Sequence, residues 1–340
     1  MQRLVVDLER AWDAARLRRK ASGPPRDFRI EPYLGHGGPE GVVVRGRVLD
    51  DPPISEAVEG EGLGAAVRRS LRQFVTDELP GVPLRVSVGD ATVEAVTDGE
   101  GYFVARLAPS ALTAPWHDGH VELAGAYRGL TDPHRTPLRV RVPDEHARFG
   151  VISDVDDTII ETGVQRVGLM LRQTFTGSAL TRTPFPGAAE LYRHLEGRDL
   201  EGGLNPFFYV SSSPWNLHGF LLAFLEHRDF PLGPLLLRDL VGSREGRARK
   251  HERIEEVLAL HPHLPFVLIG DSGEKDPQIY ADIVAAHPGR ILAVYIREVR
   301  LDPGDGRVEA VSDAWAHDVP FVLAADSAAV RRHAASIGLL

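Results

Sequence analysis

Hydrophobic and polar positions divide the chain into two regions with different periodicities. From about residue 41 to 142, short apolar runs are broken by Gly, Pro and Asp, which predicts β-strands at 42–49, 84–88, 91–96, 102–107, 121–127 and 138–142. After residue 143, apolar runs alternate with amphipathic helical patterns, which predicts strands at 149–153, 207–210, 235–237, 266–269, 291–296 and 321–323. Near-continuous apolar strands separated by helices favour a parallel sheet that is covered on both faces.

These patterns predict two domains, as a chain of 340 residues also suggests. We expect residues 1–143 to hold an N-terminal helix over 1–20 and a small β-sandwich domain that a helix at 64–78 interrupts. We expect residues 144–340 to form an α/β domain with a doubly wound parallel sheet. The sequence Gly35-His36-Gly37-Gly38 precedes a strand rather than a helix, so we interpret it as a loop.

The apolar residues of the first twenty positions have helical spacing, at Leu4, Leu8 and Trp12, and a basic run follows at 16–20. Two interpretations remain open: a solvated helix that packs on the domain, and a helix that lies on a membrane surface. Acidic residues within this segment exclude a secretory signal, so we expect a cytoplasmic location with the option of peripheral membrane contact.

Composition excludes several classes of function. No apolar stretch approaches the roughly 18 residues that a spanning helix needs, which excludes an integral membrane protein. The formal net charge of −9 argues against a general polyanion binder, so we expect no nucleic-acid partner. The chain has no cysteine, which excludes disulfides, thiolate nucleophiles and cysteine-ligated zinc. Carboxylates, His, Ser, Lys and Arg remain for chemistry.

Polar side chains follow the predicted strands of the second region. The first strand runs into Asp154 and Asp156, and the strand at 207–210 runs into Ser211-Ser212-Ser213 before a helical stretch. Carboxylates at the end of a buried strand are costly unless they are paired, hydrogen-bonded or bound to a metal. Hydroxyl and N–H groups at the start of a helix form an anion site. Ligands of doubly wound sheets bind beyond the carboxyl ends of the strands, where these groups lie.

Two later features extend this pattern. Lys250 opens an amphipathic helix within a basic run that includes Arg247, and the strand at 266–269 is followed by Asp271 and Asp276. Taken alone, each feature has an ordinary structural explanation as a turn, a helix cap or a solvated helix face. Their common position at strand and helix ends, in this order along the chain, favours one catalytic site.

The order Asp-x-Asp-x-Thr, strand–Ser, Lys, Gly-Asp-x4-Asp resembles the haloacid dehalogenase superfamily, which consists mostly of phosphatases with an aspartate nucleophile and Mg²⁺. A closer resemblance is to the actin-patch-associated family of phosphatidate phosphatases. It is carried by FGVISDVDDTI at 149–159, YVSSSPWNL at 209–217 and GDSGEKDP at 270–277. The resemblance covers about 145–325 and implies a haloacid-dehalogenase-like sheet with a small cap insertion at about 159–206.

The resemblance implies a role for each carboxylate. Asp154 is the expected nucleophile, which forms an aspartyl-phosphate. Asp156 is expected to protonate the leaving oxygen and then to activate water. Mg²⁺ prefers hard oxygen ligands, and the expected ligands are Asp154, the carbonyl oxygen of Asp156, and Asp271, with Asp276 in or near the coordination sphere.

The remaining expected site residues contact the substrate. Ser211 is expected to bind the transferring phosphoryl oxygens, and Lys250 to hold the nucleophile and the developing charge. Thr158, Ser212 and Arg247 are expected to bind substrate.

We therefore predict a Mg²⁺-dependent phosphomonoesterase, with phosphatidate as the leading substrate and diacylglycerol as product. The segment between the first two motifs is too short for a large cap domain, and an open site suits a bulky or surface-bound substrate. Two alternatives remain: a phosphatase for a soluble phosphomonoester or a nucleic-acid end, and a non-catalytic Mg²⁺- and phosphate-binding adaptor whose β domain recruits partners.

Overall fold

A computed structural model describes most of both predicted domains. The described residues are 23–51, 77–156, 158–159, 185–197, 203–238, 246–273, 275–298, 311–312 and 315–340, with the side chains of 246–249 left out. The predicted helices at 1–20 and 64–78, except for the last two residues of the second, lie outside the described residues, and so does most of the predicted cap insertion. Among the described residues, no helix has the length and apolar character that crossing a membrane requires.

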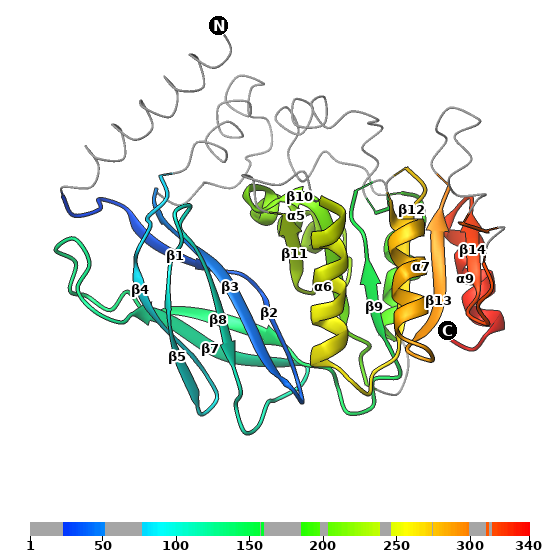
Figure 1. Ribbon diagram of the computed structural model, residues 1–340, viewed down its shortest axis with the longest axis horizontal. Coiled ribbons are helices and arrows are strands. Elements are labelled where there is room, and N and C mark those ends of the chain that lie inside the picture. The colour runs from blue at the N-terminus through cyan, green and yellow to red at the C-terminus, as the bar shows by residue number, and fades with distance from the viewer. Residues whose placement is uncertain are drawn as a thin grey trace, which may run out of the picture.

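The first region, which we call the β-domain, contains eight strands in one sheet (Figure 1). The strands are β1 (Phe28–Pro32), β2 (Gly35–Gly38), β3 (Gly41–Asp50), β4 (Pro83–Val88), β5 (Ala91–Val96), β6 (Tyr102–Leu107), β7 (Trp116–Leu123) and β8 (Thr136–Arg141). Their order is β1-β3-β2-β8-β7-β4-β5, with β6 paired to β3. All described pairings are antiparallel except β2 with β8, so the sheet is mixed. It curls around an apolar core, which confirms the predicted all-β character of this region.

The prediction of a loop at Gly35-His36-Gly37-Gly38 is wrong, because these residues form β2. All four are buried, and they pair with β3 on one side and with β8 on the other. A Cβ atom on Gly37 would lie 2.7 Å from a methyl carbon of Val42. The glycines therefore allow close packing of this strand, and their weak strand propensity conceals it in the sequence.

The second region, which we call the α/β-domain, contains a six-stranded sheet in which every described pairing is parallel. Its strands are β9 (Gly150–Ser153), β10 (Phe207–Pro214), β11 (Leu235–Arg238), β12 (Phe266–Asp271), β13 (Ile291–Arg297) and β14 (Phe321–Ala324). The order is β11-β10-β9-β12-β13-β14. The predicted α/β class with a parallel sheet is confirmed.

Helices cover both faces of this sheet (Figure 1). The helices are α4 (Ala188–Glu196), α5 (His218–His227), α6 (Gly246–Leu260), α7 (Asp276–Ala286) and α9 (Ser327–Ser336), with a short 3₁₀ turn η1 (Trp215–Leu217) ahead of α5. One apolar cluster joins α4, α5 and α9 to the sheet, and a second joins α6 and α7 to its other face. The part of the predicted cap that the structure describes includes α4, which packs into the first of these clusters.

The strand order places the first strand of the sheet at its centre. β9 pairs with β10 on one side and with β12 on the other, and each neighbour is reached by a separate crossover. The chain therefore leaves β9 at the point where the strand order reverses. Ligands of open α/β sheets bind in the crevice at this switch point.

Candidate active site

Asp154 lies at the end of the central strand, inside the protein. Its side chain is fully buried, and its backbone N–H donates to the carbonyl oxygen of Ile269 on β12 at 2.8 Å. Gly150 near the start of this strand packs tightly, because a Cβ there would lie 2.8 Å from a ring carbon of Phe266. The apolar strands β10 and β12 flank β9, so the carboxylate at its end lies buried. A buried carboxylate is costly unless it has hydrogen-bonding or charged partners.

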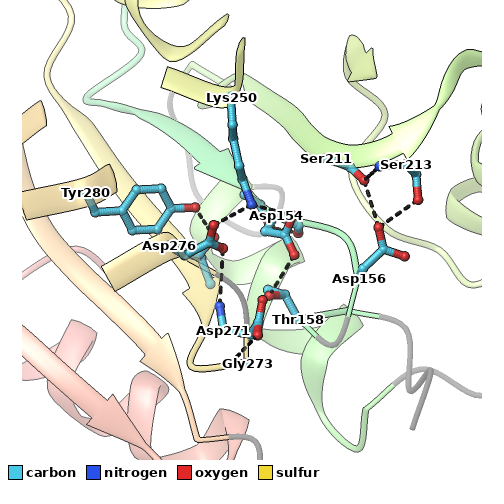
Figure 2. Close-up of polar contacts among 12 residues, drawn as sticks. Asp154, Asp156, Thr158, Ser211, Ser213, Lys250, Asp271, Gly273, Asp276 and Tyr280 are labelled. Carbon is cyan, nitrogen blue, oxygen red and sulfur yellow. Dashed lines mark hydrogen bonds and ion pairs between the residues drawn. The ribbon is translucent and has the colours of Figure 1, made fainter. Parts of the chain in front are cut away.

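Those partners form what we call the carboxylate cluster: Asp154, Asp271, Asp276 and Lys250 (Figure 2). Ligand oxygens of the three buried aspartates lie within 4.8 Å of one another. The Lys250 Nζ atom lies 2.8 Å from Asp154 Oδ1 and 2.5 Å from Asp276 Oδ1. Thr158 adds a hydroxyl that donates to Asp154 Oδ2 at 3.3 Å. Three strand or helix ends therefore converge on one buried point.

The loop after β12 shapes the far side of this cluster. The Gly273 N–H donates to Asp271 Oδ1 at 2.6 Å, and the Asp271 N–H donates to Asp276 Oδ2 at 3.4 Å. Asp276 opens α7, where the helix dipole favours a negative charge. A Cβ on Gly270 would lie 2.8 Å from the Cβ of Asp276, so only glycine leaves room for that carboxylate.

The chemistry of this donor set fits a divalent cation. Among the described residues, three buried carboxylates face one ammonium, and an excess of negative charge is costly in a buried place. Carboxylate oxygens are the hard ligands that Mg²⁺ and Ca²⁺ prefer. Asp154, Asp271 and Asp276 would hold such an ion.

Asp156 has different surroundings from Asp154. Its Oδ2 atom accepts a hydrogen bond from Ser211 Oγ at 2.8 Å and another from Ser213 Oγ at 2.7 Å. The Ser213 backbone N–H donates to Ser211 Oγ at 2.8 Å, which orients that hydroxyl. We call these three residues the serine clamp. Asp156 is 9% exposed, whereas Asp154 is 0% exposed, so Asp156 lies nearer the surface, while the two serines of the clamp are buried.

The structure brings most of the expected residues together. Asp154, Asp271, Asp276 and Lys250 meet in the carboxylate cluster, and Asp156 meets Ser211 in the serine clamp. The Asp156 carboxylate points to the serines and is not in the three-aspartate group, so a metal contact of this residue would use its carbonyl oxygen (Figure 2).

Three residues expected to bind substrate have different settings. Thr158 is buried and contacts the expected nucleophile. Ser212 is half-buried and lies between the two clamp serines on β10. Arg247 lies in the first turn of α6, and its side chain is outside the described part of the structure.

Sequence reasoning missed two residues that contact these groups. Ser213 completes the clamp, and the alternation of a strand could have identified it, because residues two apart lie on the same face. Tyr280 lies beside Asp276, and its hydroxyl donates to the Ile269 carbonyl oxygen at 2.9 Å (Figure 2). Burial first, and then the charge of Asp276, raise the pKa of Tyr280 well above its usual value, so this hydroxyl stays protonated. Helical spacing alone gives no sign of it.

Residues 149–298 match the protein family described as the catalytic domain of phosphatidate phosphatase APP1. This segment belongs to that catalytic-domain family. The matched range holds both the carboxylate cluster and the serine clamp, and the family is one of phosphoric monoester hydrolases. The predicted resemblance to the actin-patch-associated phosphatidate phosphatases is thereby confirmed.

Relatives of this family cover different shares of the chain. Phosphatidate phosphatase APP1 of Saccharomyces cerevisiae is 32% identical over 243 residues, which are 67% of this chain and 40% of the yeast protein. An uncharacterized protein of Schizosaccharomyces pombe is 30% identical over 160 residues, which are 45% of this chain and 26% of that protein. The chain thus spans less than half the length of these two relatives.

Solved structures add no argument. A carbohydrate acetylesterase from Xanthomonas citri aligns over 78% of this chain and 68% of its own, at 13% identity, but the TM-score is only 0.28.

Proposed function

We propose that this protein hydrolyses a phosphomonoester in two steps through an aspartyl-phosphate on Asp154, with Mg²⁺ as cofactor and phosphatidate as substrate. One observation carries the proposal. Two aspartates two residues apart have opposite surroundings: Asp154 lies among charged groups, whereas Asp156 is held by hydroxyls beside it. A nucleophile and a separate acid–base group are what a double-displacement phosphatase requires.

In the first step, an oxygen of Asp154 attacks phosphorus, and the bond between phosphorus and the ester oxygen breaks. Protonated Asp156 gives its proton to the leaving oxygen, so that an alcohol departs instead of an alkoxide. Lys250 holds Asp154 in one rotamer through its 2.8 Å contact, which keeps the attacking group oriented. For phosphatidate, the departing alcohol is diacylglycerol.

In the second step, the Asp156 carboxylate takes a proton from water, and the water oxygen attacks the phosphorus of the aspartyl-phosphate. The bond between phosphorus and Asp154 breaks, which releases phosphate and restores both aspartates. The two hydroxyls of the serine clamp hold Asp156 in place for both proton transfers. The same group acts as acid and then as base.

The substrate brings further negative charge to a cluster that already carries an excess of it. A bound Mg²⁺ supplies the neutralising charge that phosphoryl transfer needs. Asp154, Asp271 and Asp276 would hold the ion on the side where the buried oxygens already gather.

The family supports phosphatidate as substrate, and a soluble phosphomonoester is the second candidate. A lipid substrate requires access to a bilayer or micelle surface. The basic run at 16–20 would supply about 1 kcal/mol per residue near an anionic surface. We therefore propose peripheral membrane contact, with phosphatidate vesicles binding the protein more weakly after deletion of residues 1–20.

The test is a phosphate-release assay with purified full-length protein. Phosphatidate in mixed micelles is compared with glycerol phosphate, an aryl phosphate and a 5′-phosphorylated oligonucleotide, each with Mg²⁺ and with EDTA. We expect Mg²⁺-dependent release that is fastest from phosphatidate. A preference for a soluble ester would assign that ester as the substrate. Phosphate release that persists in EDTA would overturn the proposed requirement for Mg²⁺. No release from any ester would overturn the proposed hydrolysis.

A further inference from the structure

The β-domain contributes an aromatic residue to the core of the α/β-domain. Tyr33 lies between β1 and β2, is 4% exposed, and belongs to the apolar cluster that joins α4, α5 and α9 to the parallel sheet. Its backbone N–H donates to the Arg45 carbonyl oxygen on β3 at 2.8 Å, which fixes it to its own sheet. Tyr33 is therefore anchored in one domain and packed in the other.

The ring of Tyr33 packs on the segment that follows the serine clamp. It stacks on Trp215 with ring centres 4.8 Å apart and planes at 5°, and on His218 at 4.0 Å and 26°. Trp215 is the second residue after Ser213, and it starts η1 directly after β10. Because η1 is a single turn directly after β10, the stack supports the residues that follow the end of that strand.

A second tyrosine contacts the same turn. The Tyr102 hydroxyl on β6 donates to Asn216 Oδ1 at 3.2 Å. Two strands or strand junctions of the β-domain therefore reach two consecutive residues of η1. Such paired contacts restrict both the translation and the rotation of the turn.

The β-domain also grips the helix that carries Lys250. Glu256 lies six residues further along α6, and its carboxylate accepts from Arg45 at 2.8 Å and from Arg106 at 2.6 Å. His36 Nε2 on β2 lies 3.3 Å from its other oxygen. Figure 1 shows α6 in front of the parallel sheet, on the side next to the β-domain. One domain thus holds an element on each side of the reacting groups.

We infer that the β-domain is a positioning device for the active site, and that Tyr33 is its central positioning residue. By fixing Trp215, Tyr33 fixes the end of β10 and so the two hydroxyls that orient Asp156. This inference rests on the proposed function only for its kinetic readout. It assigns the N-terminal domain a role in the reaction itself.

The test compares three variants of the full-length protein. Tyr33→Leu removes the ring and keeps an apolar side chain, whereas Tyr33→Phe keeps the ring. Tyr127→Leu is the matched control, because Tyr127 is a buried tyrosine of the β-domain core away from the α/β-domain. All are assayed below the lowest melting temperature of the set, with kcat and KM on one ester and amide hydrogen exchange of residues 207–217.

We expect Tyr33→Leu to lower kcat by about 10- to 100-fold, as small displacements of catalytic groups do, with KM nearly unchanged. Exchange of residues 207–217 should become faster. Tyr33→Phe should keep kcat and the exchange of residues 207–217 as in the unmodified protein. Tyr127→Leu should lower the melting temperature without changing kcat or this exchange. A folded Tyr33→Leu protein with normal kcat and normal exchange would overturn the inference, and so would an equal loss of kcat in Tyr127→Leu.

The exchange measurement separates this inference from the proposed function. If the unmodified protein releases phosphate from no ester, the proposed function fails. Amide hydrogen exchange alone then tests whether Tyr33 positions the end of β10. Faster exchange of residues 207–217 in Tyr33→Leu but not in Tyr127→Leu supports positioning in that case, and unchanged exchange refutes it.

Discussion

Asp154 and Asp156 are the same side chain two positions apart, and the protein surrounds them in opposite ways. Asp154 lies in the carboxylate cluster, where an ammonium and two further carboxylates set the local charge. Asp156 lies in the serine clamp, where neutral hydroxyls hold it at the edge of the buried region. The contrast teaches that one fold can give the same side chain two sets of partners, charged groups for Asp154 and hydroxyls for Asp156. The nucleophile and acid–base roles proposed above rest on that difference.

The largest effect should come from exchanging each aspartate for asparagine. Asp154→Asn should lower kcat by roughly a thousand-fold or more, because the nucleophile is lost. Asp156→Asn should also turn over slowly, but it keeps the nucleophile. With an aryl phosphate, whose leaving group needs no proton, the first step should still occur, so the phosphorylated protein should accumulate.

Mass spectrometry of the intact proteins after acid quenching checks this contrast. We expect one added phosphoryl group on Asp156→Asn and none on Asp154→Asn. Labelling of both variants would remove Asp154 from the nucleophile role, and so would a folded Asp154→Asn protein that keeps a tenth of normal activity.

Metal binding should depend on the carboxylate cluster alone. Asp271→Asn should abolish activity at ordinary Mg²⁺ concentrations and remove the gain in stability on adding Mg²⁺, which for the unmodified protein is about 2.7 kcal/mol at a hundred times Kd. Without metal, the variant should be at least as stable as the unmodified protein, because one of three crowded negative charges is gone.

Thermal melts with Mg²⁺ and with EDTA measure this, and Asp282→Asn is the control, since Asp282 is an exposed carboxylate on α7. A Mg²⁺-dependent melting shift that survives Asp271→Asn would place the cation elsewhere.

Loss of one clamp hydroxyl should have a smaller effect. Ser211→Ala and Ser213→Ala each remove one of the two hydroxyl donors that the described residues provide to Asp156. We expect kcat to fall by roughly ten-fold, a fraction of the usual general acid–base contribution. In the Asp156→Asn background the same changes should cost little, because coupled residues are not additive. Full additivity in this double-mutant cycle of steady-state kcat values would show that the serines act apart from Asp156.

The last expectation concerns stability in acid rather than catalysis, and it involves His218, whose ring stacks on Tyr33. Burial lowers the pKa of His218 to about 3, from a usual value near 6.5. Between these values the unfolded chain binds a proton that the folded protein excludes, so stability falls as pH falls below 6.5. His218 should contribute a loss of about 2 kcal/mol by pH 5.

Denaturant unfolding at pH 7 and pH 5 checks this expectation. His218→Phe keeps an aromatic ring without a titrating group, and it should be less sensitive to acid than the unmodified protein. Identical acid sensitivity of the two proteins would contradict the expectation.

The sequence predicts the parallel sheet and the carboxylate cluster because both depend on local signals. Apolar runs identify the strands, and the groups that form the cluster lie at or near the ends of strands and helices. Asp154 follows β9, Asp271 ends β12, and Lys250 lies near the start of α6. Carboxyl ends of parallel strands meet at one edge, so their proximity follows from topology.

The features that sequence reasoning missed depend on contacts between distant segments. β2 consists almost entirely of glycine, so packing against its neighbours decides its conformation and propensity does not. Tyr33 lies more than 180 residues from Trp215, and no period or motif relates the two. Ser213 is intermediate, because the two-residue alternation of β10 points to it once the strand is known to extend to Pro214.

The central position of β9 has a consequence for synthesis on the ribosome. β9 emerges first among the strands of its sheet, yet its partners are β10 and β12, which follow by more than 50 and more than 110 residues. Until both arrive, the nascent chain presents an apolar strand with unpaired edges, which is a template for aggregation. A protein truncated ahead of Phe266 should therefore precipitate or recruit chaperones, even though it contains the complete β-domain and both aspartates of the first motif.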